Sequence, residues 1–305
     1  MGGRIAVIGS NMMDLVTYVT RRPEPGETLE APAFEMGHGG KGANQAVAAA
    51  RLGADVLMVT KVGDDSFADA TIANLQAAGV DTRHVDRVAG RSSGVASITV
   101  DPSGENSILI VKGANADLGP DDIEAAADDL KQCALILLQL EVPVETVYAA
   151  IDFGRRHGVR TLLNPAPALP DLDPERVRHA SFLVPNETEL AILTGLPVGS
   201  PDEIATAAHS LIARGVGTVI VTMGSRGALL VTAADTTAIP PVPVTPVDTT
   251  GAGDAFIGSF ARYLVAGEDA ATALGHAARY AADSITRRGT QKAYATEAEF
   301  SSRVA

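Results

Sequence analysis

The chain has 305 residues, and 46% of them are hydrophobic, which is enough to bury a large core. The net charge is −13 and the basic residues cluster only in adjacent pairs, so no nucleic-acid-binding surface is expected. No apolar run reaches the roughly 20 residues of a membrane span. The first residues, MGGRIAVIGS, do not resemble a secretion signal, and the single cysteine, Cys133, suits a reducing compartment, so we expect a cytoplasmic protein that binds no membrane.

Apolar strand-like segments alternate with alanine-rich helical segments along most of the chain. The predicted strands span 4–9, 55–63, 134–140, 160–165, 182–186 and 218–224, and the predicted helices span 41–52, 66–79, 121–131, 143–157, 187–194 and 202–214. Strands that are apolar on both faces and separated by helices predict a three-layer α/β fold, with a mostly parallel sheet covered on both sides. The length allows two domains, but no linker or repeat divides the sequence, so we expect one domain over 1–305.

Two segments, at about 14–36 and 91–113, show β-like alternation without a helix between strands. In the second, GVASITVDPSGENSILIV predicts a hairpin with DPSGEN as its turn. Ligands of open α/β sheets bind beyond the carboxyl ends of the strands, so a small sheet inserted there would act as a lid. The alternative is an extension of the main sheet's edge. We favour the lid, because both segments directly follow predicted strands.

The stretch GHGGKGANQAVAAARLG (37–53) places four glycines and Lys41 before a helix of small residues. It is not a Walker phosphate loop, because Gly42 stands where that loop has Ser or Thr. Glycines let a backbone approach a ligand closely, and Lys41 and Asn44 would then direct donors at it. A plain glycine turn before a helix explains this stretch equally well.

Two acidic features follow predicted strands. Glu141 directly follows the very apolar stretch 134–140. PNETE (185–189) places Asn186 and Glu189 three residues apart at a helix start. That spacing puts both side chains near one face, where they could hold Mg²⁺ through waters. The alternative for this pair is a helix cap of the capping-box type.

The stretch VTMGSRGALLV (221–231) places Thr222, Ser225 and two glycines at a strand's carboxyl end, before a second apolar strand. Such a turn suits the phosphates or ribose of a nucleotide. Taken alone, the stretch favours the alternative, a tight hairpin.

The most informative stretch is VDTTGAGDAF (247–256), which leads into an amphipathic helix. The N–H groups of Gly251, Ala252 and Gly253 are helix-start donors, and the helix dipole adds about half a positive charge there, so the turn predicts an anion site. Asp254 follows in the first turn. It could be an ordinary cap, or a general base that deprotonates a hydroxyl while the turn stabilises negative charge.

Together and in this order, these motifs resemble the ribokinase family of sugar kinases, also called the PfkB family, over essentially the whole chain. GGKGANQAVAAARLG and DTTGAGDAFIGSF resemble its two signatures, and NPAPA (164–168), PNETE and GSRGA stand where the ribokinase branch has them. The resemblance implies a ribokinase-like fold with a lid, and ATP-dependent phosphorylation of the 5-hydroxyl of D-ribose or 2-deoxy-D-ribose. It also implies Mg²⁺, an activating monovalent cation such as K⁺, and a homodimer in which the lid sheets clasp each other.

The resemblance also implies roles for individual positions. It implies Asp254 as the catalytic base, beside an anion hole formed by Gly251, Ala252 and Gly253. Sugar-binding positions are Asp14, Gly40, Lys41, Asn44, Glu141 and Asp254. Mg²⁺ and phosphate are supported by Asn186 and Glu189, and the nucleotide by Thr222, Ser225, Gly227 and Gly253. Oxygens for the monovalent cation come from Asp248, Thr250, Ser284, Arg287 and Gly289.

The sequence departs from the family pattern at two positions. Many ribokinases have Asn two residues before the sugar-binding aspartate, and here GSNMMD places Met12 there. A buried polar group that bonds a substrate hydroxyl discriminates strongly against the analogue lacking it. Met12 would remove that partner of the sugar 2-hydroxyl and so shift the preference toward 2-deoxyribose. In TQKAY (290–294), Ala293 replaces a common serine, which could alter the affinity for the cation.

Other functions remain open at this point. Adenosine, fructose, fructose-phosphate and ketodeoxygluconate kinases share the fold, although GGKGANQAVAAARLG disfavours them. A non-catalytic sugar or nucleoside sensor on the same scaffold would need no base, so Asp254 argues against it. A dinucleotide-binding dehydrogenase is excluded, because VIGSNMMD lacks the G-x-G-x-x-G fingerprint after the first strand.

Overall fold

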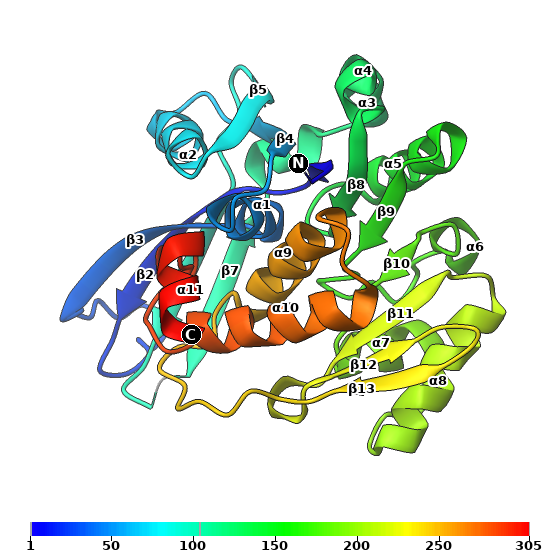
Figure 1. Ribbon diagram of the computed structural model, residues 1–305. Helices are drawn as coiled ribbons and strands as arrows, with labels where there is room; N and C mark the ends of the chain where they lie inside the picture. The colour runs from blue at the N-terminus through cyan, green and yellow to red at the C-terminus, as the bar shows by residue number, and fades with distance from the viewer. Residues whose placement is uncertain (1, 104, 305) are drawn as a thin grey trace.

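The computed structural model describes residues 2–103 and 105–304. The larger of its two sheets contains β1 (Arg4–Ile8), β4 (Val56–Val62), β5 (Val80–Arg87), β8 (Cys133–Leu138), β9 (Arg160–Leu163), β10 (Phe182–Leu183), β11 (Thr218–Thr222), β12 (Ala228–Val231) and β13 (Thr236–Ile239). Their order is β13-β12-β11-β10-β9-β8-β1-β4-β5 (Figure 1). Neighbours from β11 to β5 pair in parallel, and β12 and β13 add an antiparallel edge.

Helices cover both faces of this sheet. One face packs against α3 (Pro120–Ala125), α4 (Ala127–Leu130), α5 (Val144–His157), α6 (Pro174–Val177), α7 (Glu187–Thr194) and α8 (Pro201–Ala213). The other packs against α1 (Lys41–Arg51), α2 (Ser66–Ala77), α9 (Ala252–Val265), α10 (Ala270–Ser284) and α11 (Glu297–Val304). Alternate side chains of β1 point to opposite faces of the sheet, so Ala6 and Ile8 pack in the hydrophobic core on the first face and Ile5 and Val7 in the core on the second. The predicted three-layer fold is confirmed.

The smaller sheet is separate from the larger one, and Figure 1 shows it projecting beside α1 and α11. Its order is β3 (Ala33–Gly39), β2 (Met12–Tyr18), β6 (Val95–Val100) and β7 (Asn106–Val111). β2 pairs in parallel with β6, and the other pairs are antiparallel. The predicted small sheet is therefore confirmed, and the edge-extension alternative is wrong.

Most predicted elements match the structure within a few residues, with three kinds of difference. The helix predicted over 121–131 is two helices, α3 and α4, because the backbone at Ala126 (φ −91°, ψ 4°) interrupts the ladder. The strand β5 was not predicted, because it is a sheet edge with exposed polar residues rather than an apolar run. The short elements α6 and β13 and the helices α10 and α11 were not predicted either. No helix within the described residues is long and apolar enough to span a membrane.

Candidate active site

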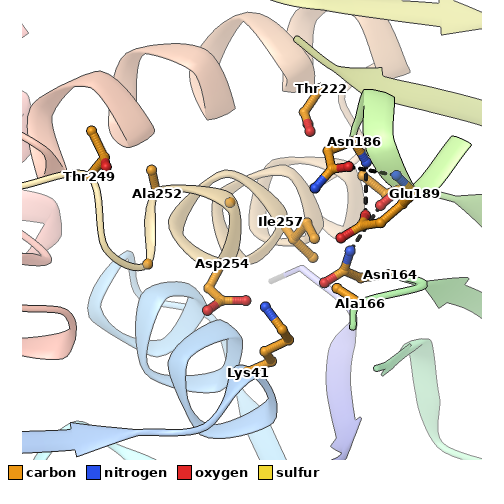
Figure 2. A pocket seen from close by; sticks show the side chains of 13 residues that line it. Lys41, Asn164, Ala166, Asn186, Glu189, Thr222, Thr249, Ala252, Asp254 and Ile257 are labelled. Carbon is orange, nitrogen blue, oxygen red and sulfur yellow. Dashed lines mark hydrogen bonds between the residues drawn. The ribbon is translucent and has the colours of Figure 1, made fainter. Parts of the chain in front are cut away.

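A cavity lies where the carboxyl ends of the central strands meet the first turns of three helices (Figure 2). The turn 249–253 and α9 form one wall, the start of α1 contributes Lys41, and the start of α7 with the end of β11 closes the other side. The lining residues are Lys41, Asn164, Ala166, Val184, Asn186, Glu189, Thr222, Thr249, Gly251, Ala252, Gly253, Asp254 and Ile257. Several motifs that are far apart in the sequence thus meet at one place.

The glycine turn has a conformation that a larger residue would disturb. Gly251 is the N-cap of α9 with φ +76°, and a Cβ there would lie 2.4 Å from Thr290 Cγ2 and 2.6 Å from the Tyr294 hydroxyl oxygen. The Tyr294 hydroxyl donates to the carbonyl of Gly251 at 2.9 Å and so anchors the turn from the C-terminal segment. The Ala252 N–H donates to the Thr249 carbonyl. Within the described residues, the Gly251 and Gly253 N–H groups have no such backbone partner, so both remain available to the predicted anion site.

Asp254 is buried beside this turn, and its carboxylate is held from α1. Oδ2 accepts a hydrogen bond from Asn44 Nδ2 at 2.9 Å, and Oδ1 accepts one from Gln45 Nε2 at 3.0 Å. Burial raises the pKa of Asp254, against the charge of Lys41 and these two hydrogen bonds, which lower it. Among the described residues the carboxylate accepts no backbone N–H, so the helix-cap alternative is wrong.

The start of α1 presents a cation to the same space. The Glu141 Oε2 atom accepts hydrogen bonds from the Lys41 backbone N–H at 2.9 Å and from Ser10 Oγ at 2.5 Å, which fixes the first turn of the helix. The Lys41 side chain then points toward Asp254 (Figure 2). Burial would lower the pKa of Lys41, but the charges of Asp254, Glu141 and Glu189 outweigh it, so the pKa is raised and the amine stays cationic.

Asn186 and Glu189 form the capping box that the sequence allowed. Asn186 Oδ1 accepts from the Glu189 N–H, and Glu189 Oε2 accepts from the Asn186 N–H, each at 2.8 Å. Both side chains nevertheless line the cavity, and burial raises the pKa of Glu189. The cap uses one oxygen of each side chain. The cap alternative is therefore correct as local structure, and it orients both groups toward the cavity.

The structure separates Thr222 from Ser225 and Gly227, the three residues of the stretch that is expected to bind the nucleotide. Thr222 lines the cavity and forms a β-bridge with Asn186. Ser225 and Gly227 lie in the turn η2 (Gly224–Arg226) and directly after it, outside the lining. A Cβ on Gly227 would lie 2.1 Å from the Ile239 carbonyl oxygen, so close packing of the β11–β12 turn against the end of β13 explains this glycine.

A second cavity lies between the inner face of the small sheet and the segments 247–250 and 288–292. Asp14 faces it from β2, and burial together with the charges of Glu141 and Asp254 raises its pKa to about 7. Met12 lies on the same face of β2 by strand alternation, but it is 3% exposed and lines neither cavity. Asn11 turns away and donates to Thr60 Oγ1 and the Lys61 carbonyl.

Three of the five residues predicted to hold a monovalent cation line this second cavity: Asp248, Thr250 and Gly289. Asp248 Oδ1 accepts from the Thr250 N–H and Oδ2 from the Gly289 N–H, each at 2.9 Å. Burial opposes ionisation of Asp248, but these hydrogen bonds prevail and lower its pKa. The Ser284 hydroxyl donates to the Ala281 carbonyl, and the Arg287 guanidinium bonds Asp283 and the Ala293 carbonyl. Arg287 could therefore offer a cation only its backbone oxygen, whereas the Ser284 hydroxyl oxygen keeps its lone pairs.

Comparison with known proteins decides the family. The family model described as "pfkB family carbohydrate kinase" matches residues 3–297. The chain belongs to the pfkB family of carbohydrate kinases. The resemblance predicted from the motifs is thus confirmed, and so is the enzyme class, a phosphotransferase that acts on an alcohol.

Several pfkB relatives match over nearly their whole length. A deoxyribokinase of Salmonella typhi is 57% identical over 296 residues, covering 97% of both chains. A ribokinase of Bacillus subtilis is 42% identical over 295 residues, again covering 97% of both. The Arabidopsis thaliana ribokinase solved with ribose and ATP has a TM-score of 0.92 at 30% identity, covering 99% of this chain and 98% of the other. The Thermotoga maritima ribokinase has a TM-score of 0.89 at 34% identity, covering 99% of each chain.

The pfkB fold also gathers residues that the motifs did not single out. Gln45 bonds Asp254 directly, Asn164 lines the cavity, and Gln291 donates to Asn44 from the far end of the chain. Gln45 follows Asn44 in the glycine-rich stretch, and Asn164 opens NPAPA, so local signals existed for both. No local signal distinguishes Gln291.

Proposed function

We propose that this protein is an ATP-dependent kinase that transfers the γ-phosphoryl group to the 5-hydroxyl of 2-deoxy-D-ribose and D-ribose. One observation carries the proposal. The buried Asp254 carboxylate lies beside the open N–H groups of Gly251 and Gly253 and faces the Lys41 cation. A base, an anion hole and a cation within one cavity are the parts that phosphoryl transfer to a hydroxyl requires.

The sugar would lie between the two cavities, with its 5-hydroxyl at Asp254. Asp254 accepts the hydroxyl proton as the oxygen attacks the γ-phosphorus, and the Gly251 and Gly253 N–H groups stabilise the charge on the transferred group. Asp14 accepts hydrogen bonds from sugar hydroxyls on the side of the small sheet. The second N–H of Asn44 is available to the sugar, because only one is needed by Asp254.

The nucleotide phosphates would enter from the side of α7 and β11, where Thr222, Asn186 and Glu189 line the cavity. The oxygen donors of Asn186 and Glu189 suit Mg²⁺, which is a hard cation that keeps several waters. No cluster of three or more His, Cys, Asp or Glu side chains occurs in the described ranges, which fits an ion held mainly through water and phosphate. Bound Mg²⁺ would neutralise charge on the phosphate oxygens.

A monovalent cation such as K⁺ fits the loop around Asp248. The Asp248 carboxylate ties Thr250 to Gly289, so it fixes the loop that precedes the glycine turn. Backbone oxygens of Ser284 and Arg287 would complete the donor set, and Ala293 adds no hydroxyl. We infer that the cation would stiffen this loop and thereby the Gly251 turn.

We infer a preference for 2-deoxyribose from two facts. The identity to a deoxyribokinase is 57%, against 42% to a ribokinase. The Asn11 amide is turned into the protein and Met12 is apolar, so neither of these two residues before Asp14 presents a polar group to the sugar. An apolar contact there tolerates the missing 2-hydroxyl.

We also infer a lid and dimer role for the small sheet. Phe34, Leu109 and Val111 share its outer face and are 57%, 76% and 57% exposed, while Asp14 faces the cavity on the opposite side. A second copy of the sheet would cover this apolar face. Light scattering is expected to give a dimer for the parent and a monomer for Leu109→Glu, and a monomeric parent would reject this role.

The deciding experiment measures ADP release with 2-deoxyribose, ribose, adenosine and fructose, with and without K⁺. We expect the highest kcat/KM with 2-deoxyribose, lower with ribose, and higher rates when K⁺ is present. Highest activity with adenosine or fructose would favour another kinase of this family. Absence of sugar-dependent ADP release would favour a non-catalytic sensor.

A further inference from the structure

A chain of three amide side chains, two of them buried and the third, Asn74, partly buried, ends on Asp254. Asn74 Nδ2 donates to Gln291 Oε1 at 2.7 Å, Gln291 Nε2 donates to Asn44 Oδ1 at 2.9 Å, and Asn44 Nδ2 donates to Asp254 Oδ2 at 2.9 Å. Gln291 is 4% exposed and Asn44 is 7% exposed, so water does not substitute for these bonds. The three amides come from α2, from η3 (Gln291–Ala293) and from α1.

The direction of this chain is dictated by its charged end. An ionised carboxylate only accepts hydrogen bonds, so Asn44 must present its NH₂ group to Asp254 and its oxygen to Gln291. Gln291 must then present its own NH₂ group to Asn44 and its oxygen to Asn74. Without the Gln291 amide, Asn44 Oδ1 would lose its donor, and the contact with the carboxylate alone would hold the Asn44 side chain in this orientation.

We propose that Gln291 is a positioning residue for phosphoryl transfer, acting through Asn44 to keep a donor on the base Asp254. This inference rests on the proposed function. Gln291 suits this role because its short segment also contacts the glycine turn, where the Tyr294 hydroxyl holds the Gly251 carbonyl. One segment thus orients the base on one side and the anion hole on the other.

The second oxygen of Asp254 has a separate support. Gln139 Nε2 donates to Gln45 Oε1 at 2.7 Å, and Gln45 Nε2 donates to Asp254 Oδ1. This arm contains none of the residues of the Gln291 arm, so it remains when Gln291 is changed. Loss of Gln291 should therefore lower the efficiency of Asp254 as the base without removing its second support.

Charged groups around Asp254 set the background for its titration. Lys41 lowers the pKa of Asp254 and Glu141 raises it. Asp14, Glu189 and the buried Tyr294 also interact with Asp254 by charge. All of these groups are retained when Gln291 is replaced by a neutral residue. A shift in the acidic limb of the kcat–pH profile would therefore show the effect of interrupting the amide chain.

The test is a double-mutant cycle with Gln291→Met and Asn44→Ala. Methionine has a similar volume and no amide, so it removes the hydrogen bonds without leaving a large cavity. We expect Q291M to lower kcat about 10-fold, because the strong hydrogen bond from Asn44 to the charged carboxylate depends on the orientation of Asn44. It should also move the acidic limb of kcat upward by about one pH unit, because Asn44 is then no longer held in place as a donor to the carboxylate. In the N44A background, Q291M should change kcat less than twofold.

The matched control is Gln76→Met on α2, which removes an exposed amide whose one side-chain partner among the described residues is Thr82, and it should leave kcat and its pH profile unchanged. An equal effect of Q291M in both backgrounds, or an unshifted acidic limb, would overturn the inference while leaving the kinase activity established. If the parent releases no ADP, the proposed function fails, and the cycle is then measured by urea unfolding. Midpoint shifts of Q291M and N44A that simply add would again overturn the inference.

Discussion

Replacing Asp14 by asparagine is expected to stabilise the protein and to weaken its sugar binding at the same time. Asp14 is partly buried, and no hydrogen bond or ion pair to its carboxylate is found among the described residues. Burial and the charges of Glu141 and Asp254 raise its pKa from 3.8 to about 7. The parent therefore holds an ionised carboxylate at pH 8 that the fold disfavours. Such a cost is expected where a group is kept for function rather than for stability.

The size and the pH window follow from linkage. Because the pKa is higher in the folded state than in the unfolded state, the folded protein binds more protons, and its stability falls as the pH rises between about 4 and 7. A shift of about three units corresponds to an upper limit of about 4 kcal/mol. Asp14 is not fully buried, and its charged neighbours can relax, so we expect D14N to gain about 2 kcal/mol at pH 8. The gain should be close to zero at pH 3.5.

Urea unfolding of the parent and of D14N at these two pH values measures the effect, and ADP release measures the loss of sugar affinity. Asp171→Asn, on an exposed loop, removes the same charge as a control. If D14N were no more stable than the parent at pH 8, or if its gain were the same at both pH values, the assigned cause of the Asp14 pKa would be wrong. An unchanged KM for the sugar would reject Asp14 as a sugar ligand.

Three further substitutions test the site. Asp254→Asn should lower kcat by about 10²–10⁴-fold with little change in sugar affinity, and near-normal turnover would contradict its role as the base. Met12→Asn should raise the ribose to 2-deoxyribose ratio of kcat/KM about tenfold; an unchanged ratio would remove Met12 from specificity. Gly251→Ala should lower both kcat and the urea midpoint, because its φ is +76° and a Cβ would meet Thr290 and Tyr294. Gly26→Ala, with φ +83° and no atom near its Cβ, isolates the backbone cost of about 1–2 kcal/mol.

Features governed by short-range spacing were predictable from the sequence. The reciprocal cap of Asn186 and Glu189 needs only three residues of separation, and the glycine turn that opens α9 needs only its own backbone. The parallel sheet followed from apolar strands alternating with helices, because such strands must be covered on both faces. Family-specific motifs then linked these local features to a kinase. From the sequence alone, Asp254 could also have been a helix cap. The structure excludes this, because no backbone N–H among the described residues donates to its carboxylate.

Longer-range features were decided by the tertiary structure alone. Gln291 meets Asn44 across 247 residues, and no local pattern marks a glutamine that will bond a distant amide. The pKa of Asp14 depends on its burial and on the charges of Glu141 and Asp254, which approach it only when β2, β8 and α9 converge. Sequence spacing determines hydrogen bonds within one turn of backbone, whereas electrostatic coupling depends on distance through space. The sequence by itself therefore identified the acid and the glycine turn, and the fold determined which amides and charges tune them.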